Sequence, residues 1–138
     1  MTDGVREGGC FCGAVRYRAA APACHVYHCH CSMCRKLHGA LYATWALVPR
    51  GQLEVIGGVD AVAIFESSPG VRRRFCQRCG CQLFCEIDSD PDFDWFTPGT
   101  LDGGVHPGHL PSREQHIFVG SKAPWHEITD DAPQREEF

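Results

Sequence analysis

The chain has 138 residues, of which 43% are apolar and 22% charged, with a formal net charge of −4 and a pI near 6.0. This length and apolar content indicate one globular domain rather than two independent cores. The acidic balance argues against nucleic acid or an anionic membrane as the main partner, because both need a basic surface. No apolar run approaches the roughly 18 residues of a membrane helix, and the first nine residues contain no apolar signal segment. We therefore expect a cytoplasmic protein.

Strand-like segments separated by Gly and Pro turns follow one another along most of the chain. In residues 12–18, Val15 and Tyr17 share one face, and Arg16 and Arg18 share the other. The other expected strands are 23–28, 41–48, 53–56, 62–66, 71–75, 82–87, 95–97 and 116–119, with a hairpin turn at 67–70. Short strands at this spacing predict an antiparallel, mainly-β fold.

Helix signals are confined to one short segment. Ser32 is the expected N-cap of a helical turn through 33–37 that ends at Gly39. We expect one domain over residues 5–128, followed by a polar, frayed tail over residues 129–138. For the oligomeric state, we leave a homodimer open.

Ten cysteines need an explanation in a compartment where thiols are kept reduced, and metal binding or catalysis is favoured over disulfides. Four of them form two closely spaced pairs with flanking glycines, namely Cys10, Cys12, Cys76 and Cys79. Two such pairs make a closed tetrahedral site of four sulfur ligands, which suits a structural zinc ion. The competing interpretation is four ordinary buried cysteines or two disulfides.

Three further cysteines form a C-x-C-x-x-C cluster at Cys29, Cys31 and Cys34. Three thiolates supply three-quarters of a tetrahedral site, and an exchangeable fourth position is typical of catalytic zinc. A zinc ion held by three thiolates carries a formal charge of −1, which the adjacent Arg35 and Lys36 help to balance. The open alternatives for the fourth ligand are Cys81, which would close a second structural site, or Cys24, Cys85, His28, His30, a water or an incoming thiol.

Four motifs in this order resemble the glutathione-dependent formaldehyde-activating enzyme family, which includes the centromere protein V domain. They are residues 8–17, 29–36 and 75–80, and Lys122-Ala123-Pro124-Trp125 near the end. The resemblance covers about residues 8–125 and implies a β-tent fold of stacked antiparallel sheets with two zinc ions. It implies a structural zinc on Cys10, Cys12, Cys76 and Cys79, and a catalytic zinc on Cys29, Cys31 and Cys34.

The resemblance also implies a carbon–sulfur lyase that forms or cleaves S-hydroxymethylglutathione, so the expected partner is a small-molecule thiol such as glutathione. Arginine pairs well with carboxylates, which makes Arg72, Arg73, Arg74 and Lys122 candidate anchors for the two glutathione carboxylates. The alternative for the arginine run is a strand with two arginines in solvent and one on the other face. Candidate acid–base groups are His38, His106, His109 and His116, because histidine titrates near neutrality.

Two other functions remain open. One is a non-catalytic, zinc-stabilised binding module of the same fold. The other is a thiol-redox or zinc-storage protein, because thiolates of an incomplete site oxidise readily.

Overall fold

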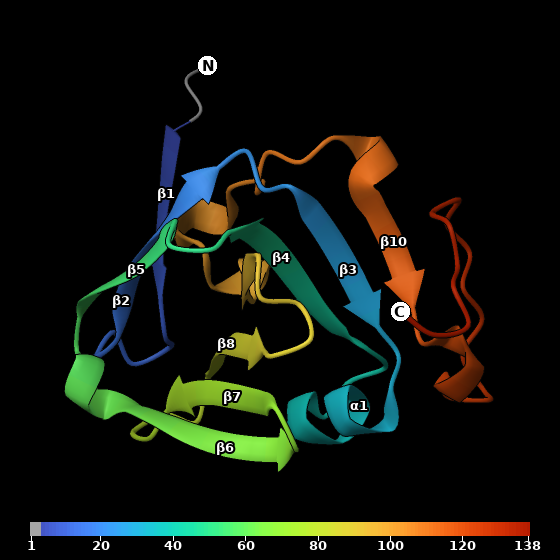
Figure 1. Cartoon of the computed structure of the whole chain (residues 1–138), viewed down its shortest axis with the longest axis horizontal. Helices are drawn as coiled ribbons and strands as arrows, with labels where there is room; N and C mark the ends of the chain where they lie inside the picture. Colours follow the sequence, from blue (N-terminus) through green and yellow to red (C-terminus); the bar gives the residue numbers. More distant parts are fainter. Residues whose placement is uncertain (1–3) are drawn as a thin grey trace.

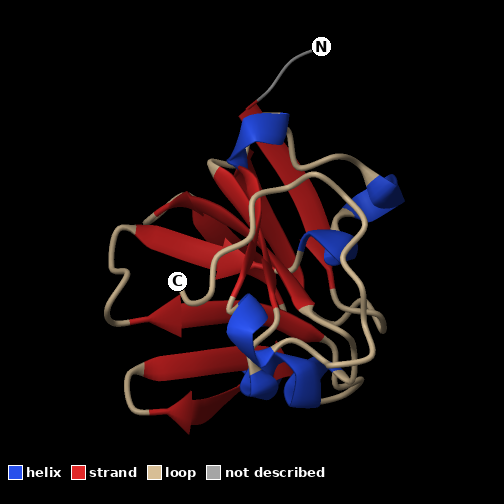
Figure 2. Ribbon diagram, turned by 90° about the vertical axis from the view of Figure 1, so that its right-hand side faces the viewer, coloured by secondary structure: helices blue, strands red, loops and turns tan. Residues whose placement is uncertain are grey.

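The computed structural model describes residues 4–138. The first three residues, which begin the segment where no signal sequence is expected, lie outside this range. In the described part of the chain, two β-sheets and short helical segments form the mainly-β fold that the sequence predicts (Figures 1 and 2). No helix there is both long and apolar enough to cross a membrane.

The smaller sheet has three antiparallel strands in the order β1-β2-β5, with bounds β1 Gly4–Gly9, β2 Arg16–Ala21 and β5 Leu53–Gly57. The expected alternation in β2 is confirmed, since Tyr17 is buried and Arg18 is exposed. β2 begins later than expected, because the residues before it form a turn in which the Cys10 N–H donates to the Val15 carbonyl. Strand β1 was not predicted, since glycine-rich segments have low strand propensity.

The larger sheet has seven strands in the order β10-β3-β4-β9-β8-β7-β6. Their bounds are β3 His25–Cys29, β4 Ala43–Pro49, β6 Val62–Ser68, β7 Val71–Cys76, β8 Gln82–Ile87, β9 Phe93–Phe96 and β10 Glu114–Ile117. Neighbouring strands are antiparallel, as predicted, except that β10 runs parallel to β3. This parallel pair departs from the expected all-antiparallel arrangement.

The helices are short and lie in connections between strands (Figure 2), except η5, which follows β10. They are α1 Ser32–His38, η1 Val59–Ala61, η2 Pro98–Thr100, η3 Asp102–Gly104, η4 Pro111–Arg113 and η5 Val119–Ser121. Helix α1 lies where expected and ends at Gly39, whose φ of 58° is left-handed. Its N-cap is Cys31 rather than Ser32, because the Cys31 sulfur accepts the Cys34 N–H.

Strand β4 of the larger sheet is buried on both faces, whereas the edge strand β6 has no buried residue. Alternate residues of β4 belong to different cores: Ala46 packs with Tyr17, Phe84 and Phe96 under the smaller sheet, whereas Trp45 packs with Tyr27 and Trp95. Cys10 and Cys76 join the first core, and Cys29 and Cys34 join the second. Since successive side chains of a strand point to opposite faces, the two cysteine clusters lie on opposite faces of the sheet.

The C-terminal segment is held in place, which corrects the expectation of a frayed tail. The His116 N–H donates to the Pro133 carbonyl at 2.8 Å, and the Phe118 N–H donates to the Glu137 carbonyl at 3.1 Å. Figure 1 shows the segment beside β10. The Phe138 ring packs 5.5 Å from that of Tyr27. A polar composition did not reveal this docking, because the segment pairs through its backbone with the edge of the sheet.

Candidate metal centres

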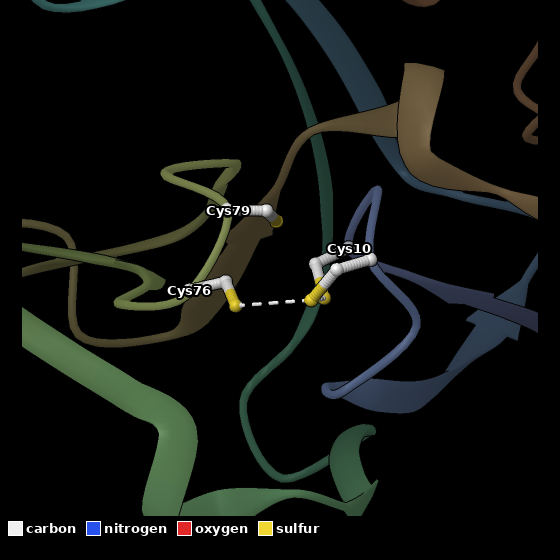
Figure 3. A group of neighbouring side chains, drawn as sticks. Cys10, Cys76 and Cys79 are labelled. Carbon is white, nitrogen blue, oxygen red and sulfur yellow. Dashed lines mark hydrogen bonds between the residues drawn. The ribbon is translucent and has the colours of Figure 1, made fainter.

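The first cysteine cluster joins two segments that are far apart in the sequence. Cys10 and Cys12 lie in the turn between β1 and β2, and Cys76 and Cys79 lie at the β7–β8 turn (Figure 3). The four sulfurs lie within 4.8 Å of one another. The Sγ–Sγ distance is 3.6 Å for Cys10–Cys12 and 3.8 Å for Cys12–Cys76. Zinc–sulfur bonds of about 2.3 Å in a tetrahedron give sulfur separations of about 3.8 Å, so these residues fit a four-thiolate zinc site.

Backbone N–H groups point at the sulfurs of this cluster. The Val15 N–H donates to Cys10 Sγ at 3.2 Å. Hydrogen bonds from the backbone of Cys12 and then Cys81 lower the pKa of Cys79 to about 6. Gly80 follows Cys79 with a φ of +78°, and its N–H donates to the Cys76 carbonyl at 2.7 Å. This turn requires a left-handed residue, which explains the glycine after the second cysteine.

The second cluster is built from the end of β3 and the start of α1. The sulfurs of Cys29, Cys31 and Cys34 lie within 4.8 Å of one another. Hydrogen bonding from Cys29, and then from Cys34, lowers the pKa of Cys31 to about 2, while the Cys29 pKa is raised, chiefly by its hydrogen bond to Cys31. The trio thus forms one thiolate readily, and a cation is needed to ionise the others. Three converging sulfurs fit a metal ion that prefers sulfur ligands, as the four sulfurs of the first cluster do.

In the described residues 4–138, no His, Cys, Asp or Glu joins this trio as a fourth member. Cys81 packs against the core that contains Cys10 and Cys76, which places it near the first cluster and corrects the alternative in which it closes the second. Cys24 and Cys85 also lie outside the group. The two histidines are engaged elsewhere: His28 with Thr44 and Glu114, and His30 with His116.

Arg73 contacts the second cluster directly. Its side chain is buried, Nη1 donates to Cys34 Sγ at 3.4 Å, and Nε donates to Ser67 Oγ at 2.8 Å. Its neighbours Arg72 and Arg74 face the other way, toward Glu86. The predicted alternative, a strand with one arginine turned away from the other two, is confirmed. The contact between this arginine and the second cluster was not predicted, although the same alternation was the available signal.

The expected glutathione anchors and acid–base groups are mostly engaged with other residues. Arg72 pairs with Glu86 and Asp88, and Lys122 Nζ donates to the His126 carbonyl at 2.7 Å. Burial, followed by the charge of Arg73, lowers the pKa of His38 to about 4. His106 stacks on His109, which pairs with Glu114, and His116 pairs with Asp130.

A cavity of about 230 Å³ opens beside the second cluster. Its walls are mostly apolar, with Arg73, Ser89 and the cysteines as the polar exceptions, and none of the four candidate histidines lines it. The lining residues are Cys29, Cys31, Met33, Cys34, Trp45, Val71, Arg73, Cys85, Ile87, Ser89, Trp95, Ile117, Phe118 and Phe138. Cys85 therefore shares the cavity with the trio. Burial raises its pKa to about 11, so it is a neutral thiol at pH 7.

A second hollow, of about 350 Å³, lies along α1 on the surface. Arg35 and Lys36 contribute two cations to its wall, and Trp125, which is 78% exposed, contributes an indole. Arg35 follows Cys34 in the chain, so this cationic groove begins one residue from the second cluster, although the groove and the cavity share no lining residue.

Fold and site together define a mainly-β protein with a complete four-cysteine centre and an incomplete three-cysteine centre, both able to hold metal ions. The family model for the glutathione-dependent formaldehyde-activating enzyme matches residues 5–121. The chain belongs to this family, as its motifs indicated.

Relatives and a solved structure agree with this assignment. A protein of Halomonas elongata, provisionally named a glutathione-dependent formaldehyde-activating enzyme, is 30% identical over 88% of this chain and 80% of its own length. A protein of Aspergillus flavus with the same provisional name is 31% identical, and the match covers 62% of this chain and 56% of that protein. A crystal structure of a Rhodobacter sphaeroides protein is 26% identical and superposes with a TM-score of 0.60, covering 73% of this chain and 91% of that one.

Proposed function

We propose that this protein is a zinc-dependent carbon–sulfur lyase that forms or cleaves S-hydroxymethylglutathione or a related adduct of glutathione and an aldehyde. The observation that carries the proposal is the contrast between the two centres. The first has four protein sulfurs, whereas the second has three sulfurs and a cavity where a fourth ligand would lie. Closed zinc sites are structural, and three-ligand sites bind substrate.

We assign Cys10, Cys12, Cys76 and Cys79 to the structural zinc, and Cys29, Cys31 and Cys34 to the catalytic one. A zinc ion at the second centre supplies positive charge that stabilises sulfur as thiolate. The reaction itself is not a redox step. In the cleavage direction the carbon–sulfur bond breaks, its electron pair goes to sulfur, and the hydroxyl proton of the adduct ends on the thiol, leaving an aldehyde.

The residues around the cluster supply charge balance and orientation. The Arg73 guanidinium offsets the formal charge of −1 of a zinc ion with three thiolates and holds Cys34 in place. The apolar cavity walls exclude water from the reacting carbon. Because Arg73 is already engaged, the glutathione carboxylates fit better in the adjoining groove, at Arg35 and Lys36.

The test is exchange NMR of glutathione, formaldehyde and their adduct with protein that carries two zinc ions per chain. We expect faster exchange than in buffer. Cys31→Ala should retain the fold and one zinc ion and lose the acceleration. The matched control is Cys24→Ala, because Cys24 lies outside both clusters.

Two results would contradict the proposal. A wild-type protein with both zinc ions and no acceleration excludes this substrate. Four protein sulfurs at the second zinc, measured by X-ray absorption, favour the non-catalytic binding module.

A further inference from the structure

The cavity beside the second cluster is too large and too apolar for formaldehyde. Its volume is about 230 Å³, whereas an apolar cavity of about 150 Å³ suffices to hold benzene. Formaldehyde has two heavy atoms and would leave most of this space unfilled. Contacts with the wall would then be lost, which is unfavourable in a packed interior.

The chemistry of the walls favours an uncharged occupant. Among the described residues that line the cavity, Arg73 is the one cation, and it already donates to Cys34 and Ser67. Trp45, Trp95, Phe118 and Phe138 supply aromatic surface instead. Besides the cysteines, Ser89 is the other polar side chain of the lining, so the charged arms of glutathione fit better outside the cavity.

The cysteines fix which part of a substrate enters. Cys29, Cys31 and Cys34 line the cavity together with the aromatic side chains. The sulfur of an adduct is bonded to two carbons, one from glutathione and one from the aldehyde. Since the charged arms of glutathione fit better outside, the aldehyde-derived carbon is the one that faces the cavity when the sulfur approaches the trio, and its side group points among the aromatic walls.

We infer that this cavity binds the side group of an aryl-substituted aldehyde, such as phenylacetaldehyde, so that the preferred substrate is the glutathione adduct of such an aldehyde rather than of formaldehyde. The inference rests on the proposed function for its chemistry. The bond that breaks is the same carbon–sulfur bond, and the products are an aryl-substituted aldehyde and the free thiol.

The first experiment compares phenylacetaldehyde, formaldehyde and the polar glycolaldehyde as partners of glutathione, by exchange NMR with the zinc-loaded protein. We expect the acceleration, as kcat/KM, to be 10- to 100-fold larger for phenylacetaldehyde, which is about 1.4–2.8 kcal/mol at 1.4 kcal/mol per tenfold. An acceleration for phenylacetaldehyde that is equal to or smaller than the acceleration for formaldehyde overturns the inference.

A variant tests whether the side group binds in this cavity. Val71 lines the cavity from β7, so Val71→Phe should fill it and abolish the preference for phenylacetaldehyde over formaldehyde. The matched control, Val5→Phe, places the same side chain on β1, where Val5 is 53% exposed. It should keep the preference. A preference that survives Val71→Phe in folded protein overturns the assignment of the cavity.

A binding measurement separates this inference from the proposed function. Toluene should shift the indole N–H signals of Trp45 and Trp95 in the NMR spectrum of the wild-type protein, because both side chains line the cavity. Toluene binding without any acceleration of exchange refutes the lyase and supports the apolar ligand class. Acceleration of formaldehyde exchange without toluene binding refutes the inference and leaves the lyase.

Discussion

Arg73 shows how one residue can decide the electrostatics of a site. Its guanidinium is buried against Cys34, with Ser67 fixing its orientation. A buried arginine without an anionic partner would be costly. The position therefore indicates that the sulfur cluster carries negative charge in the folded protein.

Replacing this arginine should weaken metal binding at the second centre. We expect Arg73→Met to lower its zinc affinity about 10- to 100-fold, as losses of outer-shell partners do. Competition with a chromophoric chelator measures this. The matched control is Arg74→Met, on the opposite face of the same strand and 38% exposed, which should keep wild-type affinity. Equal losses in both variants would contradict a specific role for Arg73.

At the level of elements, the sulfurs of the first cluster depend on how neighbouring turns fit together. The turn that carries Cys10 and Cys12 passes close to Gly58, at the junction between β5 and η1. A Cβ at Gly58 would lie 1.8 Å from the Ala14 carbonyl oxygen, and its φ is +74°. This close approach of two backbones admits only glycine.

Gly58→Ala should therefore destabilise the fold by more than about 2 kcal/mol, because a left-handed residue alone costs about 1–2 kcal/mol and the clash adds to it. Urea denaturation of the zinc-loaded protein measures the change. Gly57→Ala is the neighbouring control, since its Cβ would make only ordinary contacts with Arg16 at 3.6 Å or more. A Gly58→Ala protein as stable as Gly57→Ala would show that the turn can shift.

Across the whole molecule, the two centres lie on opposite faces of one sheet. The first links the β1–β2 turn to the β7–β8 turn and so joins the two sheets. The second lies beside the other core and its cavity. The proposed structural and catalytic centres are therefore separated in space.

Chelation should remove the two proposed zinc ions in order. The second ion has three protein ligands and should leave first, with the fold retained. Loss of the first should unfold the chain, because structural zinc contributes about 10 kcal/mol or more. Zinc content and near-UV circular dichroism, followed together during a chelator titration, check this. Simultaneous loss of both ions with unfolding would contradict the separation, and Cys31→Ala should show only the second step.

The sequence by itself determined the mainly-β class, the face alternation of β2, the short helix ended by Gly39, and the grouping of seven cysteines into a set of four and a set of three. These are local properties, since residue spacing fixes geometry within a turn or a strand. Only the tertiary structure decided that Arg73 meets Cys34, that Cys81 lies with the first cluster, and that residues 133–137 hydrogen-bond to the backbone of residues 116–120 beside β10. Such contacts depend on strand register, where a shift of one residue sends a side chain to the opposite face.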